Sequence, residues 1–213
     1  MIAIVDAGLG NLRSVARALA ATGTAEEVKL VSDPQAVRDA ARVVVPGQGA
    51  FGEAASALRP DAPLGSAIVE SIKSGKPYLG ICLGLQVLFA SSEESPGHPG
   101  FGLFPGRVRR LPSGVLDEEG RRLKVPNMGW SRIAVRGFHP VLEVPSGDAW
   151  FYFVHSFHAV PEDERLIAAV CAFGDVPVTA AVARDNVIGV QFHPEKSQAA
   201  GLAVLRAFVG WKC

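Results

Sequence analysis

The stretch Tyr78-Leu79-Gly80-Ile81-Cys82-Leu83-Gly84 runs from a short apolar segment directly into a helical pattern that continues to residue 89. Cys82 stands at the junction, two residues after one glycine and two residues before another. A nucleophile between small residues, after a strand and before a helix, describes a nucleophile elbow, here with cysteine in place of serine. The following helix offers free N–H groups to a thiolate or an oxyanion. The stretch predicts an α/β fold with a reactive cysteine at a strand end.

Upstream of this stretch, short apolar runs alternate with helical patterns. The expected strands are residues 2–5, 28–31, 42–45 and 78–81, and the expected helices are residues 12–23 and 63–74. Pro46 is expected to stop the third strand. Apolar strands that alternate with helices predict an open, mostly parallel central sheet with helices on both faces. Chemistry in such sheets gathers at the carboxyl ends of the strands, where Cys82 lies.

The second half of the chain has a different pattern, with short strand-like pieces in place of the strand–helix alternation. The expected strands there are residues 108–111, 132–135, 150–154, 167–173 and 178–183, and a last helix covers residues 199–209. These strands predict an antiparallel extension of the sheet edge. No linker, repeat or low-complexity segment divides the chain, so we expect one domain over residues 1–213.

The composition is that of an ordinary globular protein. The 213 residues are 48% hydrophobic and 20% charged, with a formal net charge of zero, which does not favour a nucleic-acid or membrane-surface role. Three cysteines are too few for a disulfide scaffold and favour a reducing compartment. No leader and no apolar run of membrane-spanning length is visible, so we expect a cytoplasmic protein.

A base for the cysteine is found near the carboxyl terminus. Residues 187–192 read as a strand, His193 follows at its end, and Glu195 comes two residues later. Residues two apart in extended chain project to the same side, so Glu195 is expected to approach the imidazole. A cysteine, a histidine that moves its proton and a carboxylate that orients the histidine have the roles of a catalytic triad.

Other patterns are weaker, and each piece of the triad alone has a structural interpretation. A cysteine among apolar residues is most often a buried core residue. Gly8 and Gly10 lack the third glycine of a dinucleotide motif, because Arg13 stands there. His155 and His158 lack further ligands for a metal. A basic cluster is interpreted as a solvated face; it comprises Arg107, Arg109, Arg110, Arg121, Arg122 and Lys124.

The motifs around Cys82 and His193 together resemble those of the class I glutamine amidotransferases, and the resemblance covers essentially the whole chain. This class has a flavodoxin-like α/β fold and a Cys-His-Glu triad, which places the catalytic roles on Cys82, His193 and Glu195. Further segments resemble the glutaminase subunits of imidazole glycerol phosphate synthases. They are residues 6–12, 45–51, 126–130 and 152–157.

The resemblance implies a site that hydrolyses glutamine to glutamate and ammonia through a cysteinyl thioester. The oxyanion would be held by the Leu83 N–H and by the loop of Gln48 and Gly49, where glycine allows a peptide to turn. The implied substrate-binding residues are Gly47, Gln86, Glu94, Ser156 and Phe157. Two positions depart from the family: Gln48 stands where valine is common, and Phe157 stands where tyrosine is common.

The resemblance also implies a partner that consumes the ammonia, because ammonia in water is mostly protonated. This partner would be a cyclase subunit, a (β/α)8 barrel that makes imidazole glycerol phosphate, in a heterodimer that needs no cofactor and no metal. The residues expected at or near the interface are Asn11, Trp130, Tyr152 and Lys196. By the same resemblance, the chain alone is expected to be poorly active until the partner binds its own ligand.

Three alternatives remain open on the sequence. The chain could be a glutaminase for another acceptor, as in anthranilate or pyridoxal phosphate synthesis. It could be a cysteine hydrolase or amidase that acts without a partner, which has no need of Gln86. It could also be a binding module that keeps the sheet and has lost catalysis, an interpretation that the intact triad disfavours.

Overall fold

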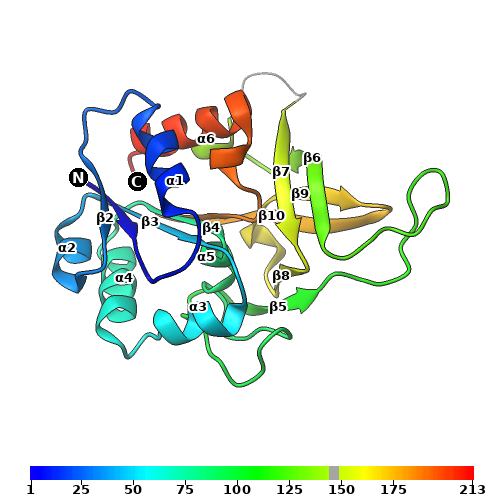
Figure 1. Cartoon of the computed structure of the whole chain (residues 1–213), viewed down its shortest axis with the longest axis horizontal. Coiled ribbons are helices and arrows are strands. Elements are labelled where there is room, and N and C mark those ends of the chain that lie inside the picture. Colours follow the sequence, from blue (N-terminus) through cyan, green and yellow to red (C-terminus); the bar gives the residue numbers. More distant parts are fainter. Residues whose placement is uncertain (144–148) are drawn as a thin grey trace.

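The structure, a computed structural model, describes residues 1–143 and 149–213. Within these ranges nine strands form one sheet in the order β2-β1-β3-β4-β11-β10-β9-β6-β7, and β5 and β8 form a separate pair (Figure 1). The strands are β1 (Ile2–Val5), β2 (Val28–Val31), β3 (Arg42–Gly47), β4 (Tyr78–Cys82), β5 (Gly106–Arg110), β6 (Asn127–Val135), β7 (Trp150–His155), β8 (Phe157–Pro161), β9 (Ile167–Phe173), β10 (Val176–Arg184) and β11 (Val187–Val190).

One side of the sheet is parallel. β1 pairs with β2 and β3, β3 pairs with β4, and β4 pairs with β11, all in parallel. Every residue of β1, β4 and β11 is buried, as expected for strands covered on both faces. β11 comes from the far end of the chain, and its insertion beside β4 brings His193 to the edge where Cys82 lies.

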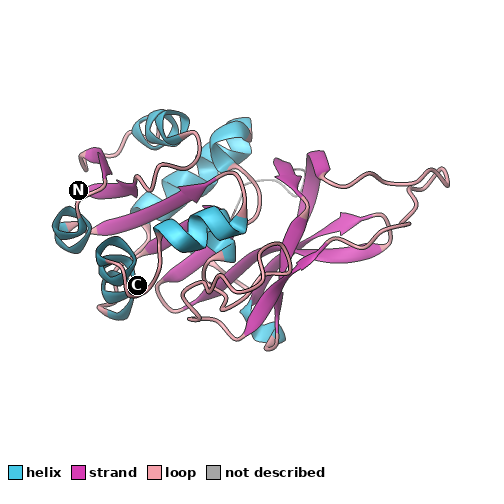
Figure 2. Ribbon diagram, turned by 60° about the horizontal axis from the view of Figure 1, so that its bottom comes forward, coloured by secondary structure: helices cyan, strands magenta, loops and turns pink. Residues whose placement is uncertain are grey.

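Helices cover both faces of the parallel strands (Figure 2). The helices are α1 (Leu12–Ala20), α2 (Pro34–Asp39), α3 (Phe51–Ala57), α4 (Pro63–Lys73), α5 (Leu83–Gln86) and α6 (Gln198–Gly210). α1 and α6 pack on one face in a core that includes Leu19 and Phe208. α2, α3 and α4 pack on the other, around Val37, Phe51 and Ile68. None of the helices in the described ranges combines the length and the apolar composition that a membrane span requires.

The other side of the sheet is antiparallel. β10 pairs with β11 and β9, and β6 pairs with β9 and β7, all antiparallel. An open, mostly parallel core sheet with helices on both faces and an antiparallel extension in the second half is therefore confirmed as the fold.

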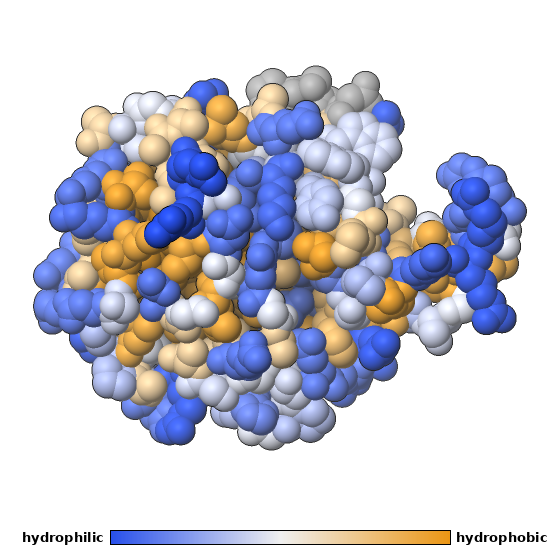
Figure 3. Space-filling view, viewed as in Figure 1, coloured by the Kyte–Doolittle hydropathy of each residue, from blue (hydrophilic) through white to orange (hydrophobic). Residues whose placement is uncertain are grey.

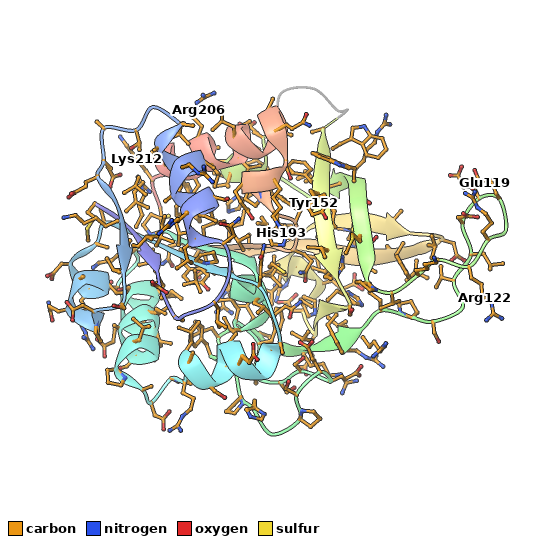
Figure 4. All side chains as sticks on the ribbon, viewed as in Figure 1. Glu119, Arg122, Tyr152, His193, Arg206 and Lys212 are labelled. Carbon is orange, nitrogen blue, oxygen red and sulfur yellow. The ribbon has the colours of Figure 1, made fainter. Side chains whose placement is uncertain are left out.

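A hairpin arm, residues 112–124, projects from the antiparallel side and is hydrophilic at its tip, where Glu119 and Arg122 lie (Figures 3 and 4). Part of the predicted basic cluster lies here. Arg121 forms ion pairs at 2.7 Å with both Asp117 and Glu119, so its charge is neutralised within the arm. Arg109 pairs with Glu93 at 3.1 Å in the same way. These contacts fit the interpretation as a solvated surface.

Several predicted boundaries were wrong for identifiable reasons. β3 continues through Pro46 to Gly47, because its pairing with β1 ends at Val44 and a proline is tolerated once one strand edge is unpaired. The helix after Cys82 ends at Gln86 rather than at residue 89. The carbonyls of Val87 and Leu88, next along the chain, accept hydrogen bonds from residues 101, 103 and 104 instead.

The remaining differences concern the ends and the number of elements. β6 begins at Asn127, five residues before the expected start at Arg132, and β11 ends at Val190 rather than at residue 192. α2, α3 and β8 were not predicted. Each is short, seven residues or fewer, so periodicity carries little signal there.

Candidate active site

Cys82 occupies a strained turn at the junction of β4 and α5. Its φ of 54° and ψ of −104° lie outside the conformations that non-glycine residues prefer, and its side chain is 6% exposed. The Tyr78 hydroxyl donates a hydrogen bond to the Gly84 carbonyl at 2.7 Å and so stabilises the turn. The predicted elbow is therefore present, with the sulfur held at the carboxyl end of the sheet.

The two glycines of the elbow are required by close backbone contacts. A Cβ atom on Gly84 would lie 1.8 Å from the Val45 carbonyl oxygen, and a Cβ atom on Gly80 would lie 2.3 Å from the Gly84 carbonyl oxygen. Neither obstacle is a flexible side chain. The elbow is therefore packed directly against the neighbouring strand β3.

Substituting Gly84→Ala is expected to lower the stability of the folded chain by at least about 2 kcal/mol, because backbone must shift to admit the methyl group. The melting temperature should then fall by roughly 4–8 °C. Gly210→Ala is the matched control, since a Cβ atom at Gly210, the last residue of α6, meets nothing within 4 Å. Equal melting temperatures for the two variants in thermal unfolding would contradict this account of the elbow.

His193 and Glu195 form a buried pair. The His193 Nδ1 atom lies 2.9 Å from Glu195 Oε1, and the two side chains are 1% and 2% exposed. The approach does not occur in extended chain, as the spacing suggested, because residues Pro194–Lys196 form a 3₁₀ turn that brings the carboxylate back to the ring. The His193 backbone is anchored by its N–H to the Tyr152 carbonyl at 2.9 Å.

The electrostatics of this pair favour a charged imidazole. Burial by itself lowers the pKa of His193, but the Cys82 sulfur and the Glu195 carboxylate together raise it to about 9. With Nδ1 donating to Glu195, Nε2 is the nitrogen that remains for proton transfer. Within the described residues Nε2 makes no hydrogen bond, as expected of an atom whose partner is a reacting group.

The predicted oxyanion residues lie beside the nucleophile. Gly47 is the register partner of Cys82 in the β3–β4 pair, and a Cβ atom on Gly47 would lie 2.7 Å from the Leu83 Cβ. Only glycine therefore lets the loop approach the elbow this closely. Gly49 has a φ of +114°, a conformation that side chains disfavour and that allows the peptide to turn.

A cavity of about 420 Å³ opens at this edge of the sheet. Its wall contains the predicted nucleophile and base, Cys82 and His193, together with the predicted oxyanion residues Leu83, Gln48 and Gly49. Glu195 does not line the cavity and lies behind His193, as a group that orients the base should. The structure thus brings the loop after β3, the junction of β4 and α5, and the segment after β11 to one site.

Four of the five predicted substrate-binding residues also line this cavity. They are Gln86, Glu94, Ser156 and Phe157, whereas Gly47 lies beneath it against Leu83. Glu94 also has a structural contact, because its Oε2 accepts a hydrogen bond from the Phe51 N–H at 2.8 Å. Glu94 therefore links the cavity to the first residue of α3, directly after the oxyanion loop.

Two buried polar residues of the site were not anticipated. Gln191 donates from Nε2 to the Cys82 sulfur at 3.4 Å and accepts at Oε1 from Gln86 Nε2 at 3.0 Å. Its signal in the sequence is a polar residue directly after the apolar run 187–190. His155, which lines the cavity, lies 3.0 Å from the Phe157 carbonyl through Nδ1 and 3.2 Å from Asn127 through Nε2.

His155 is held neutral. Burial lowers its pKa to about 4, so the ring carries a single N–H group. Because the Phe157 carbonyl can only accept, Nδ1 carries that proton, and Nε2 accepts from the Asn127 amide. His155 thereby braces the cavity wall at Phe157. Among the described residues no group of three or more His, Cys, Asp or Glu side chains is arranged to hold a metal.

Three of the four predicted interface residues form a row beside the cavity. Trp130 on β6 packs edge-on against its cross-strand partner Tyr152 at 5.9 Å, and the Lys196 ammonium lies 5.6 Å from the centre of the Tyr152 ring. Tyr152 and His193 lie side by side at the centre of the molecule (Figure 4). Trp130 is 42% exposed and is therefore not a core residue.

Asn11 lies at the start of α1, outside this set of contacts. It does not line the cavity, and its side chain accepts a hydrogen bond from the Ser14 N–H at 3.4 Å as the amino-terminal cap of α1. The structure thus shows Asn11 as the cap of this helix. Its predicted place at an interface stays a prediction.

Comparisons with known proteins give a consistent family. Residues 3–210 match the family described as "Glutamine amidotransferase class-I". A relative from Nitrosomonas europaea named "Imidazole glycerol phosphate synthase subunit HisH" is 46% identical over 211 residues, which cover 99% of this chain and 98% of the relative. A relative of the same name from Pyrococcus furiosus is 41% identical over 207 residues, 97% of each chain.

Solved structures support the fold. One described as "Crystal structure of glutamine amidotransferase" superposes with a TM-score of 0.70 at 20% identity and covers 99% of each chain. Another, "Structure of PurLQS from Thermotoga maritima", gives a TM-score of 0.71 at 20% identity over 98% of this chain and 97% of that one. At this identity the likeness concerns the fold alone.

Proposed function

This chain belongs to the class I glutamine amidotransferase family, and from that premise we propose that it is the glutaminase subunit of an imidazole glycerol phosphate synthase, which acts in histidine biosynthesis. One observation carries the catalytic part: the buried His193–Glu195 pair, 2.9 Å apart, faces the cavity that contains Cys82. Full-length relatives named for that synthase support histidine biosynthesis as the pathway that uses the ammonia. Their names disfavour the alternatives of anthranilate or pyridoxal phosphate synthesis.

The reaction begins with attack of the Cys82 thiolate on the side-chain amide carbon of glutamine, which forms the S–C bond and moves an electron pair onto the amide oxygen. The Leu83 N–H and the loop of Gln48 and Gly49 stabilise this oxyanion. Protonated His193 gives its Nε2 proton to the departing nitrogen, and ammonia leaves with a thioester behind. His193 then takes a proton from water, which attacks the thioester and releases glutamate.

The cavity wall supplies groups for the rest of the substrate. Gln86 Oε1 is buried without a hydrogen-bond partner among the described residues, so a donor on the substrate satisfies it. Glu94 provides a carboxylate for the substrate ammonium group, and the turn of Ser156 and Phe157 provides backbone groups for its carboxylate. Gly47 keeps the oxyanion loop against the elbow.

We place the ammonia-consuming partner on the row of Trp130, Tyr152 and Lys196, with Asn11 at its margin. An exposed tryptophan beside the cavity mouth suits a protein interface, where aromatic residues are enriched. The partner is a cyclase subunit with a (β/α)8 barrel, and residues 1–213 form one cytoplasmic glutaminase domain in a heterodimer. Ammonia released at a covered site reaches the acceptor before water protonates it.

The test measures glutamate release from glutamine by the chain alone and by the chain with the cyclase subunit and its nucleotide ligand. We expect strong release only in the loaded complex, coupled to imidazole glycerol phosphate formation. Equal release in both samples would indicate a glutaminase that acts without a partner. If a different ammonia-consuming enzyme stimulated glutamate release and the cyclase did not, that enzyme would be the acceptor instead.

A further inference from the structure

Gln191 is a fully buried amide that touches the nucleophile. It directly follows the apolar strand β11, its side chain is 0% exposed, and its own N–H donates to the Ala180 carbonyl at 2.8 Å. Burying a primary amide is costly unless its polar atoms are hydrogen-bonded. Both side-chain atoms are used: Oε1 accepts from Gln86, and Nε2 donates to the Cys82 sulfur.

The direction of these hydrogen bonds is determined by a backbone group. The Phe157 carbonyl can only accept, so Gln86 must turn its Nε2 toward it, at 3.1 Å. The second hydrogen of that Nε2 then requires an acceptor, which is Oε1 of Gln191 at 3.0 Å. The amide of Gln191 is thereby oriented with its N–H groups toward the sulfur of Cys82, 3.4 Å away.

We propose that Gln191 is a positioning residue of the glutaminase, which orients the Cys82 sulfur by N–H donation and ties it to the substrate-binding amide of Gln86. An N–H that donates to sulfur favours the thiolate over the thiol and restricts rotation about the Cα–Cβ bond of the cysteine. The hydrogen bond between Gln191 and Gln86 keeps the Cys82 sulfur at a fixed position relative to the substrate-binding amide of Gln86.

A purely structural role makes a different prediction. Gln191 neighbours Phe192, which is buried in the apolar core, and an apolar side chain of similar length would fill the same space. If filling were its role, such a side chain would preserve both the fold and the properties of the sulfur. If Gln191 acts on Cys82, the substitution changes the reactivity of the sulfur while the fold remains.

The test uses Gln191→Met, which keeps the length and removes both hydrogen bonds, and Gln191→Glu, which keeps an acceptor for Gln86 and replaces the donor by a carboxylate. The first readout is the pH dependence of Cys82 alkylation by iodoacetamide in the full chain. We expect the midpoint to rise by about one pH unit in Gln191→Met, and by more in Gln191→Glu, because a donor to the thiolate is lost.

The second readout is glutamine turnover in the complex with the cyclase. We expect kcat to fall about tenfold to hundredfold in Gln191→Met, the range given by loss of one hydrogen bond to a charged group. Ser71→Ala is the matched control, since it removes a buried hydrogen bond to the Val37 carbonyl on α2, remote from the cavity. This control should leave both readouts unchanged.

Alkylation midpoints and kcat values that match those of the unsubstituted chain in both Gln191 variants would overturn the proposal. So would changes that appear equally in Ser71→Ala. The kinetic readout rests on the proposed function, whereas alkylation needs neither glutamine nor partner. A chain that hydrolyses no glutamine yet shows the shifted alkylation midpoint would refute the proposed function and retain the role of Gln191.

Discussion

Replacing Cys82 by alanine is expected to lower glutamine-dependent synthesis of imidazole glycerol phosphate by roughly 10⁴-fold to 10⁶-fold. The complex should still use added ammonia. Loss of a nucleophile removes the covalent route entirely, and effects of this size are seen for other triads. Cys82 is 6% exposed, and alanine fits in its place because it is smaller than cysteine. The measurement compares glutamate release and product formation with glutamine or with ammonium salt.

The chain itself offers a matched control for this substitution. Cys171 on β9 is also buried, and burial raises the pKa of its thiol to about 12, so it remains an unreactive core residue. Cys171→Ala is expected to retain glutaminase activity with a modest loss of stability. If Cys82→Ala hydrolysed glutamine as fast as Cys171→Ala, covalent catalysis by Cys82 would have to be abandoned.

Substituting Glu195→Gln is expected to lower kcat for glutamine by roughly 10³-fold to 10⁴-fold. The carboxylate accepts a hydrogen bond from the Nδ1–H group and contributes to raising the pKa of His193. A neutral amide at this position removes that support and lowers the pKa of His193. It also no longer selects the tautomer in which Nδ1 carries the proton and Nε2 faces the substrate. The measurement is kcat against pH in the loaded complex, in which the step attributed to His193 should move to lower pH.

A control for Glu195 is Glu70→Gln. Glu70 is an exposed carboxylate on α4 that pairs with Arg38 at 2.6 Å, far from the cavity. Loss of an exposed pair should leave kcat and its pH dependence unchanged. A Glu195→Gln variant that kept kcat within threefold of the Glu70→Gln value would exclude the triad role of Glu195.

The parallel half of the fold was predictable because its signals are local. β1 and β4 are continuous apolar runs, β2 is an apolar run interrupted by Lys29, and the helix after Asn11 has its buried residues on one side. The nucleophile elbow was equally visible, since Cys82 and the glycines on both sides of it lie within five consecutive residues. Predictions that depended on neighbouring strands were less accurate, as the extension of β3 beyond Pro46 illustrates.

The identity of the triad could be inferred from the sequence, whereas its geometry could not. The expected contact between His193 and Glu195 exists, but a 3₁₀ turn produces it rather than extended chain. The helix after Cys82 is shorter than its pattern indicated, because carbonyls beyond it bond to a distant segment of the chain. Local patterns do not report such long-range hydrogen bonds.

The chemistry could be inferred from the sequence alone: a cysteine in an elbow, a histidine followed by a glutamate, and a family that hydrolyses glutamine. Which residues surround the sulfur depends instead on how distant strands pair. The insertion of β11 beside β4 places Gln191 against Cys82, although 109 residues separate them along the chain. Strand order in a parallel sheet arises from crossover connections and shared core packing. Periodicity within a segment describes only that segment, so the partner of a strand is settled by the fold as a whole.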